Sequence, residues 1–291
     1  MRKSGKSGSS GCSENSNISI DSSSTSFPQS AHEVCATTRH LFTVAYDGAG
    51  FEGWQSQRGG NTVQDVIEAA FKRLVKQPVR IHGAGRTDAG VHALAQRFHV
   101  DTPTLRMDAI TWVKALNSTL PPTIRILTAR RVTPDFHARF SAKKKTYHYL
   151  IRNADILPPH EAKRMWLVPQ TLPLMALREA AEIFVGTHDF SAFSAKRDRS
   201  KPIPSELPPD NRRTIYSIRI SQRGTLIRLA FTGNGFLYKM VRMLTATIVR
   251  HAQGRVTLEE LRAYLSPSPS PPTRWNHTAP ADGLYLEKIF F

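Results

Sequence analysis

The order of strand-like and helix-like segments restricts the fold of this chain more than any other feature of its sequence. Short apolar or alternating segments bounded by turn residues predict strands at 41–46, 79–82, 94–100, 124–132, 146–152, 215–221, 225–231 and 284–291. Apolar residues with a period of 3.6 predict helices at 63–74, 107–118, 174–185 and 236–253, and capping boxes are expected at Thr62 and Thr257. Because strands and helices do not alternate strictly, we expect an α+β fold in which helices flank a mixed, mostly antiparallel sheet.

The chain is expected to divide into a tail and two lobes. Twelve of residues 1–40 are serine, and the isolated apolar residues there cannot bury enough surface to balance the entropy of ordering. We therefore expect residues 1–39 to be a disordered, serine-rich tail. The grouping of strands and helices repeats loosely before and after residue 140, which predicts an N-terminal lobe at 40–140 and a C-terminal lobe at 141–291 on one sheet.

The body of the chain is strongly basic. The 291 residues include 40 Lys and Arg against 23 Asp and Glu, a formal net charge of +17. Only four of these basic and three of these acidic residues lie in residues 1–40, so the excess belongs to the folded part. Such an excess predicts a polyanionic partner, nucleic acid before a membrane surface. No apolar segment approaches the length of a membrane span, so we expect a soluble protein.

Several kinds of site are excluded by what the sequence lacks. Both cysteines, Cys12 and Cys35, lie in the predicted tail, which excludes a cysteine nucleophile or a cysteine-ligated metal in the body and is typical of a reducing compartment such as the cytoplasm. Residues 48–53 match G-x-G-x-x-G, but a loop follows them rather than a helix, so no nucleotide cofactor is expected. The eleven histidines are scattered without metal-ligand spacing, and no metal is expected.

The segment 83–92, GAGRTDAGVH, is the most informative part of the sequence. It lies between two predicted strands, and its glycines allow sharp bends and the close approach of another chain. Arg86 would keep the accessible carboxylate of Asp88 ionised, and such a carboxylate can act as a nucleophile or stabilise an electron-poor sugar carbon. The spacing alone also fits a simpler role, in which Asp88 caps a turn and pairs with Arg86.

The same loop resembles a known family. Residues 85–93 are similar to the catalytic loop of the TruA family of tRNA pseudouridine synthases. Further segments resemble that family in the same order, namely YDG at 46–48, GWQ at 53–55, FHARFSA at 136–142, KKKTYHY at 143–149, GTHDFSAF at 186–193, NGFLYKMVR at 234–242 and GLYL at 283–286. The departures are the long tail and a basic, proline-rich insertion at 196–213. The resemblance implies a two-lobed pseudouridine-synthase-like fold, with the catalytic loop in the first lobe and the second lobe completing the active site.

The resemblance also implies a role for individual residues. Asp88 falls on the catalytic aspartate, and Arg242 falls on the basic residue that pairs with it. Tyr147 falls on the tyrosine that stacks on the target base and moves a proton, although a phenol can do so only if its pKa is lowered. Arg86 falls on the arginine that helps to hold the target nucleotide out of the RNA helix.

The reaction implied is the isomerisation of uridine to pseudouridine at positions 38 to 40 of the tRNA anticodon arm, by a homodimer. It breaks the bond between C1′ and N1 and rejoins the base through C5, so it requires no cofactor. Basic side chains are expected to grip phosphates rather than read bases, namely Arg139, Lys143, Lys144, Lys145, Arg197, Arg199, Lys201, Arg212 and Arg213.

Two other functions remain compatible with the residues. A non-catalytic RNA-binding protein or tRNA chaperone would use the same basic surface, but would not need Asp88, Tyr147 and Arg242 together. A base-excising glycosidase would need a second carboxylate to activate water, and the sequence does not single one out.

Overall fold

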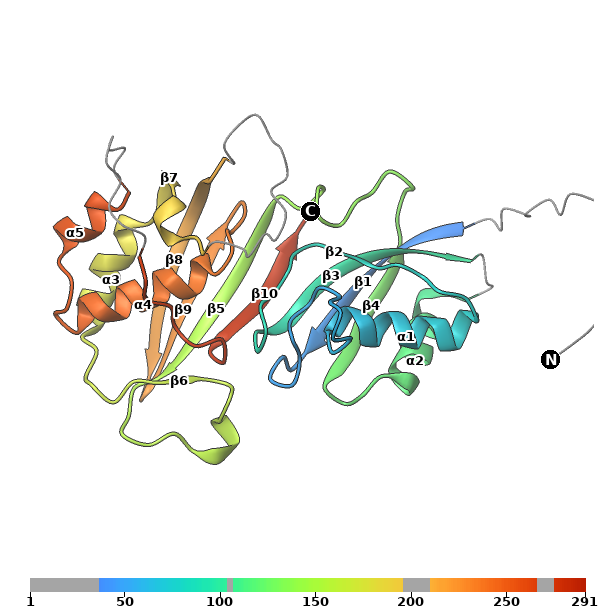
Figure 1. The fold of residues 1–291 in the computed structure, drawn as a ribbon, viewed down its shortest axis with the longest axis horizontal. Helices are drawn as coiled ribbons and strands as arrows, with labels where there is room; N and C mark the ends of the chain where they lie inside the picture. Colours follow the sequence, from blue (N-terminus) through green and yellow to red (C-terminus); the bar gives the residue numbers. More distant parts are fainter. Residues whose placement is uncertain (1–36, 104–106, 196–209, 266–274) are drawn as a thin grey trace, which may run out of the picture. The chain divides into compact units, whose positions relative to one another are not determined.

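One ten-stranded sheet runs through the part of the chain that the structure describes (Figure 1). The computed structural model describes residues 37–103, 107–195, 210–265 and 275–291. The strands are β1 (Thr37–Tyr46), β2 (His82–Gly83), β3 (His92–Pro103), β4 (Ile124–Arg131), β5 (Lys144–Arg152), β6 (Trp166–Leu167), β7 (Gly186–Asp189), β8 (Arg212–Arg223), β9 (Leu226–Gly233) and β10 (Leu284–Phe290). Their order is β4-β1-β3-β10-β5-β9-β8-β7, with β2 beside β3 and β6 beside β5.

The last strand of the chain joins the two halves of the sheet. In Figure 1 the red strand β10 lies between β3 and β5. It pairs parallel with β3 and antiparallel with β5. Among the described strands, the β10–β3 and β5–β6 pairs are parallel and all other pairs are antiparallel. The expected α+β architecture with a mixed, mostly antiparallel sheet is confirmed. Strands from residues 37–131 and from residues 144–233 thus share one sheet, on which side chains from both halves of the chain can meet.

Helices cover each half of the sheet. Their bounds are α1 (Val63–Val75), α2 (Ala109–Thr119), α3 (Leu174–Ile183), α4 (Met240–Ala252) and α5 (Leu258–Ala263), with short 3-10 turns η1 (Pro159–Glu161) and η2 (Ser191–Phe193). In Figure 1, α1 and α2 lie beside β1 and β4, whereas α3, α4 and α5 lie near β8. The backbone N–H of Asp65 donates to the Thr62 side chain at the start of α1, and the predicted capping box at Thr257 is present at α5. No helix of the described segments is long and apolar enough to cross a membrane.

The core beneath α1 and α2 explains why the first strands hold their positions. Phe42 of β1 stacks on Phe98 of β3 with ring centroids 5.1 Å apart, and Phe71 of α1 meets Phe42 edge-on. Trp112 of α2 closes the same cluster, and all four side chains are at most 1% exposed. Burying each of these rings stabilises the fold by roughly 1.5–3 kcal/mol. Because strand side chains alternate between faces, the neighbouring residues of β3 point to the opposite face of the sheet.

Several element boundaries differ from those predicted, and three of the differences affect the tail, the strand before the catalytic loop and α4. Residues 37–39, assigned to the tail, are the first residues of β1. The strand expected at 79–82 is reduced to β2, because the N–H of Ile81 bonds to the carboxylate of Glu68 instead of a strand. Helix α4 begins at Met240 rather than at residue 236, because Lys239 adopts a left-handed conformation with φ of 60°.

Several sequence predictions fall on residues that the structure does not describe. They include residues 1–36 of the predicted tail with both cysteines, Cys12 and Cys35. The basic residues Arg197, Arg199 and Lys201 of the insertion lie there too.

Candidate active site

The predicted catalytic loop lines a large cleft. The cleft has a volume of about 1130 Å³, which exceeds the size of a typical small-molecule pocket. Asp88 and Arg86 reach it from the loop between β2 and β3, Lys145 and Tyr147 from β5, and Phe236 from the turn before α4. The two halves of the chain therefore contribute to one cavity, because β10 holds β3 and β5 close together.

Hydrogen bonds hold the loop around Asp88 in one conformation. The carbonyl of Thr87 accepts the N–H of Trp54 at 3.1 Å, and the Thr87 hydroxyl meets the phenol oxygen of Tyr46 at 2.8 Å. The side chain of Gln96 donates to the carbonyl of Gly85 at 2.9 Å. The residues just before Asp88 are thus fixed to β1, to β3 and to the loop at Trp54, so Asp88 is presented from a rigid support.

The loop after β1 packs closely against the backbone at Val91, which gives a stability prediction at Gly48. A Cβ at this position would lie 2.0 Å from the carbonyl oxygen of Val91, a backbone atom that cannot rotate away. We expect Gly48→Ala to lower the free energy of unfolding by about 3 kcal/mol, measured by urea denaturation. Gly50→Ala is the matched control, because nothing lies within 4 Å of its Cβ position. Equal stability of the two variants would contradict the packing described here.

Asp88 and Arg242 form an ion pair across the cleft wall. Nη1 of Arg242 lies 3.2 Å from Oδ2 of Asp88, although the residues are 154 positions apart. The side chain of Arg242 is only 15% exposed, and that of Asp88 is 19% exposed. Nε of Arg242 also donates to the carbonyl oxygen of Ala279 at 2.8 Å. The guanidinium, in the first turn of α4, is therefore oriented by two acceptors and in turn fixes the position of the carboxylate.

Tyr147 lies beside this pair but is not a phenol with a lowered pKa. Its side chain is 8% exposed, and its ring meets Phe236 edge-on with centroids 5.2 Å apart. Burial, with smaller contributions from Tyr46 and Asp88, raises the pKa of Tyr147 well above its usual value. In the free protein the pKa of this phenol is therefore raised rather than lowered, and proton transfer by Tyr147 stays a prediction. The ring remains available for contact with a base.

The three consecutive lysines have different surroundings. Nζ of Lys145 donates to the carbonyl of Ala84 at 2.7 Å inside the cleft, and burial lowers the pKa of Lys145 to about 8. Lys144 points to the other face of β5, where its ammonium lies 4.6 Å from the centre of the Phe290 ring. Lys143 and Lys144 do not line the cleft, whereas Lys145 and the exposed Arg86 do.

The sequence did not single out several side chains that the structure brings to the cleft. Glu52 is a second carboxylate in its lining, and Leu237, Tyr238 and Lys239 line it because α4 begins later than predicted. The start of α4 could not be predicted from the sequence, because the apolar pattern with a period of 3.6 continues through Lys239 and does not indicate its left-handed conformation.

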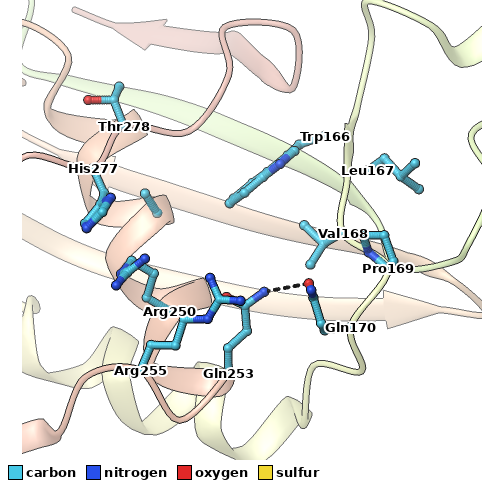
Figure 2. A pocket seen from close by; sticks show the side chains of 11 residues that line it. Trp166, Leu167, Val168, Pro169, Gln170, Arg250, Gln253, Arg255, His277 and Thr278 are labelled. Atoms are coloured by element: carbon cyan, nitrogen blue, oxygen red, sulfur yellow. Dashed lines mark hydrogen bonds between the residues drawn. The ribbon is translucent and has the colours of Figure 1, made fainter.

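A second, smaller pocket lies away from Asp88. Its volume is about 270 Å³, and Figure 2 shows Trp166, Arg250, Arg255 and His277 around it. Gln253 of α4 donates to the side chain of Gln170 at 3.1 Å across this pocket. The described residues that line it include neither a carboxylate nor any predicted catalytic residue. The cleft at Asp88 is therefore the candidate active site.

Comparisons with known proteins agree with this geometry. The sequence pattern of a family described as "tRNA pseudouridine synthase" matches residues 43–141 and 180–291, which include Asp88 and Arg242. A protein of Akkermansia muciniphila named tRNA pseudouridine synthase A is 50% identical over 256 residues, 87% of this chain and 95% of that protein. Proteins of the same name from Rhodospirillum rubrum and Staphylococcus aureus are 38% and 37% identical over 87% of this chain, and over 87% and 90% of their own lengths.

The sheet, the cleft and these matches define the class of the protein as a pseudouridine synthase, an isomerase. The chain belongs to the TruA family of tRNA pseudouridine synthases.

Proposed function

We propose that this protein converts uridine to pseudouridine at positions 38 to 40 of the tRNA anticodon arm, with Asp88 as the catalytic carboxylate. The observation that carries the proposal is the ion pair of Asp88 with Arg242 at 3.2 Å, on a rigid loop in an open cleft. The substrate comes from the relatives' names, and the positions rest on the family resemblance.

The chemistry is an isomerisation in which atoms only change partners. The bond between C1′ and N1 breaks, the uracil turns, C5 bonds to C1′, and the C5 proton leaves. Detachment of the base leaves C1′ electron-poor, and the carboxylate of Asp88 stabilises that carbon. Arg242 holds the carboxylate in place, and its second bond to Ala279 prevents the guanidinium from following the substrate.

The target base must leave the RNA helix to reach Asp88. Extrusion costs a few kcal/mol, which contacts in the cleft have to balance. Tyr147 and Phe236 provide aromatic surface at the cleft wall, and Arg86 is exposed at its edge, where the resemblance places a residue that holds the nucleotide out.

A homodimer in the cytoplasm completes the proposal. The homodimer rests on the family resemblance, and the cytoplasm rests on that resemblance and on the cysteine usage. Sedimentation equilibrium of the full chain, alone and with tRNA, measures whether the protein is a homodimer.

The test uses tRNA transcripts tritiated at uracil C5, incubated with the purified protein without added metal or cofactor. We expect tritium in the water, and its loss when uridines at positions 38 to 40 are replaced by cytidines. Release that persists on the replaced transcript would show that the positions are wrong. Salt-sensitive binding without release would indicate a non-catalytic RNA-binding protein, and free uracil would indicate a glycosidase.

Lys145 gives a prediction for the pH dependence of RNA binding. Its ammonium carries a charge below about pH 8 and loses it as the pH rises through that value. If Lys145 contacts a phosphate, the slope of log K against log salt becomes shallower by about one unit between pH 7 and pH 9.5. Filter binding of tRNA at several salt concentrations measures this slope.

The neighbouring lysine provides the control. Lys145→Met is expected to have the shallower slope at both pH values, whereas Lys144→Met, on the opposite face of β5, keeps the pH-dependent change. A pH-dependent slope that survives in Lys145→Met would assign the titrating charge to another residue.

A further inference from the structure

Three histidines from distant parts of the sequence meet beside the catalytic cleft. His82 of β2 pairs with His99 of β3, and their rings stack 4.9 Å apart at 17°. His137, from the segment after β4, meets His99 at 4.7 Å and 63°. Each of the three rings contributes one nitrogen atom, and these three nitrogen atoms lie within 4.8 Å of one another. His82 and His137 also line the cleft. The cluster therefore presents polar ring atoms to the cavity that contains Asp88.

Backbone hydrogen bonds assign the protons of two of these rings. The N–H of Ala138 donates to Nδ1 of His99 at 3.1 Å, and the N–H of Arg139 donates to Nδ1 of His137 at 3.2 Å. A ring nitrogen that accepts an N–H carries no proton, so each neutral ring is assigned its proton on Nε2. The hydrogen bonds found among the described residues occupy only Nδ1 of these two rings. Their Nε2–H groups are therefore donors.

This arrangement is unfavourable for a metal ion. A histidine that binds a metal normally donates the proton of its other ring nitrogen to a carbonyl or carboxylate. In His99 and His137 the other nitrogen, Nδ1, accepts a backbone N–H. A metal at Nε2 would move the ring proton to Nδ1, where it would face that backbone N–H, so that two donors would point at each other. Two histidines whose Nδ1 atoms accept backbone N–H groups suit an acceptor such as a phosphate oxygen better than a cation.

The charges around the cluster also favour an anion. Arg39 of β1 is paired with Asp101 of β3 at 2.7 Å, which leaves neither charge in excess. Arg139, two residues after His137, also lines the cleft. Besides the other two histidines, these are the charged groups that act on His99 and His137, and among them Arg139 adds a positive charge beside the balanced Arg39–Asp101 pair.

The rings of His99 and His137 are neutral at pH 7 in the free protein. Burial, followed by the charges of His82 and His137, lowers the pKa of His99 to about 4. Burial, followed by His82, Arg39 and Arg139, also lowers the pKa of His137. His99 and His137 are therefore hydrogen-bond donors without charge at neutral pH.

We propose that His82, His99 and His137 form a binding site for a backbone phosphate of the RNA on which the enzyme acts. His82 and His137 contact the phosphate oxygens, and His99, 2% exposed between them, is a positioning residue. The proposal rests on the proposed function in one respect, that the ligand is the substrate RNA.

The test compares tRNA binding by His137→Asn with binding by the wild type. The asparagine Oδ1 takes the place of Nδ1 and still accepts the N–H of Arg139, so the turn is kept, whereas nothing replaces Nε2–H. We expect a Kd about tenfold weaker at pH 8, with an unchanged salt slope because a neutral donor releases no counterion. His160→Asn is the control, because its side chain is 80% exposed.

A second variant and a second measurement keep the test decisive. His82→Asn, on an exposed side chain, is expected to weaken binding in the same way should His137→Asn fail to fold. Long-range proton–nitrogen NMR of ¹⁵N-histidine protein should show the Nε2–H form of His99 and His137, and shifts of His82 and His137 with tRNA. The same NMR measurement with inorganic phosphate instead of RNA distinguishes free phosphate from the RNA backbone as the ligand. The proposal is overturned if the NMR signals of His82 and His137 shift with phosphate but not with RNA, or with neither.

Two further outcomes would overturn it as well. The first is a Kd equal to that of the wild type in both His82→Asn and His137→Asn. The second is binding of one equivalent of Zn²⁺ that the wild type shows and His137→Asn loses. Failure of the proposed function is recorded separately, because wild-type protein that releases no tritium but binds RNA through His137 would leave the phosphate site standing.

Discussion

Asp88→Asn is expected to lower the rate of tritium release from tRNA by about a thousandfold or more, because an amide can neither attack nor stabilise an electron-poor C1′ as a carboxylate does. The amide has the shape of the carboxylate, and its oxygen can still accept a hydrogen bond from Arg242. The ion pair is partly exposed, so the free energy of unfolding should change by only about 1 kcal/mol. Single-turnover assays and urea denaturation measure the two effects separately.

The control for this variant removes the same charge elsewhere. Asp155 is exposed and does not line the cleft, so Asp155→Asn should retain the wild-type rate. If Asp88→Asn kept its rate within tenfold, Asp88 would not be the catalytic carboxylate. Glu52, the other carboxylate in the cleft lining, would then be the residue to test.

Arg242→Lys is expected to lower kcat about a hundredfold while changing KM much less. The lysine keeps the positive charge, but one ammonium cannot reproduce the planar fork that holds Oδ2 of Asp88 and the carbonyl of Ala279 together. The carboxylate would then be displaced from the position in which it meets C1′, and small displacements of this kind are costly for rate. Steady-state kinetics on a tRNA transcript separates kcat from KM.

Arg250→Lys is the matched control on the same helix. Arg250 lies two turns further along α4, at the smaller pocket of Figure 2 and outside the cleft. Its substitution should leave both kinetic constants near wild type. Full activity in Arg242→Lys would mean that charge alone, without the bidentate geometry, supports Asp88.

The catalytic loop was readable from the sequence because its chemistry is local. Three glycines, Arg86 and Asp88 stand within eight residues between two apolar segments, and the family resemblance rests on the same residues. Arg242 was different, because its place on α4 lies off the apolar stripe and is typical of a solvent-exposed arginine. Only the family resemblance indicated its partner, and only the packing of α4 against the segment around Ala279 brings the two charges to 3.2 Å.

The direction of the pKa shifts could not be predicted from spacing. Tyr147 was expected to need a lowered pKa in order to transfer a proton, and burial raises that pKa instead. Lys144 and Lys145 are neighbours in the sequence, yet one stacks on Phe290 and the other lies in the cleft with a pKa of about 8. Alternation along a strand separates the two lysines, but it does not reveal which face other elements will cover.

The histidine cluster shows the same limit. Eleven histidines without metal-ligand spacing indicated no site, because periodicity reports only neighbours along the chain. The register of β2 on β3 places His82 opposite His99, and the segment after β4 adds His137. Each contact depends on hydrogen bonds between segments far apart in the sequence.

By itself the sequence determined the α+β class, the approximate positions of most helices and strands, the basic body and the loop that carries Asp88, because each depends on residues a few positions apart. The tertiary structure alone decided which face of β5 is buried, where α4 begins, how Arg242 reaches Asp88 and how three histidines meet. The physical reason is that burial and electrostatic contact arise between segments that lie far apart in the sequence and meet only in the folded sheet.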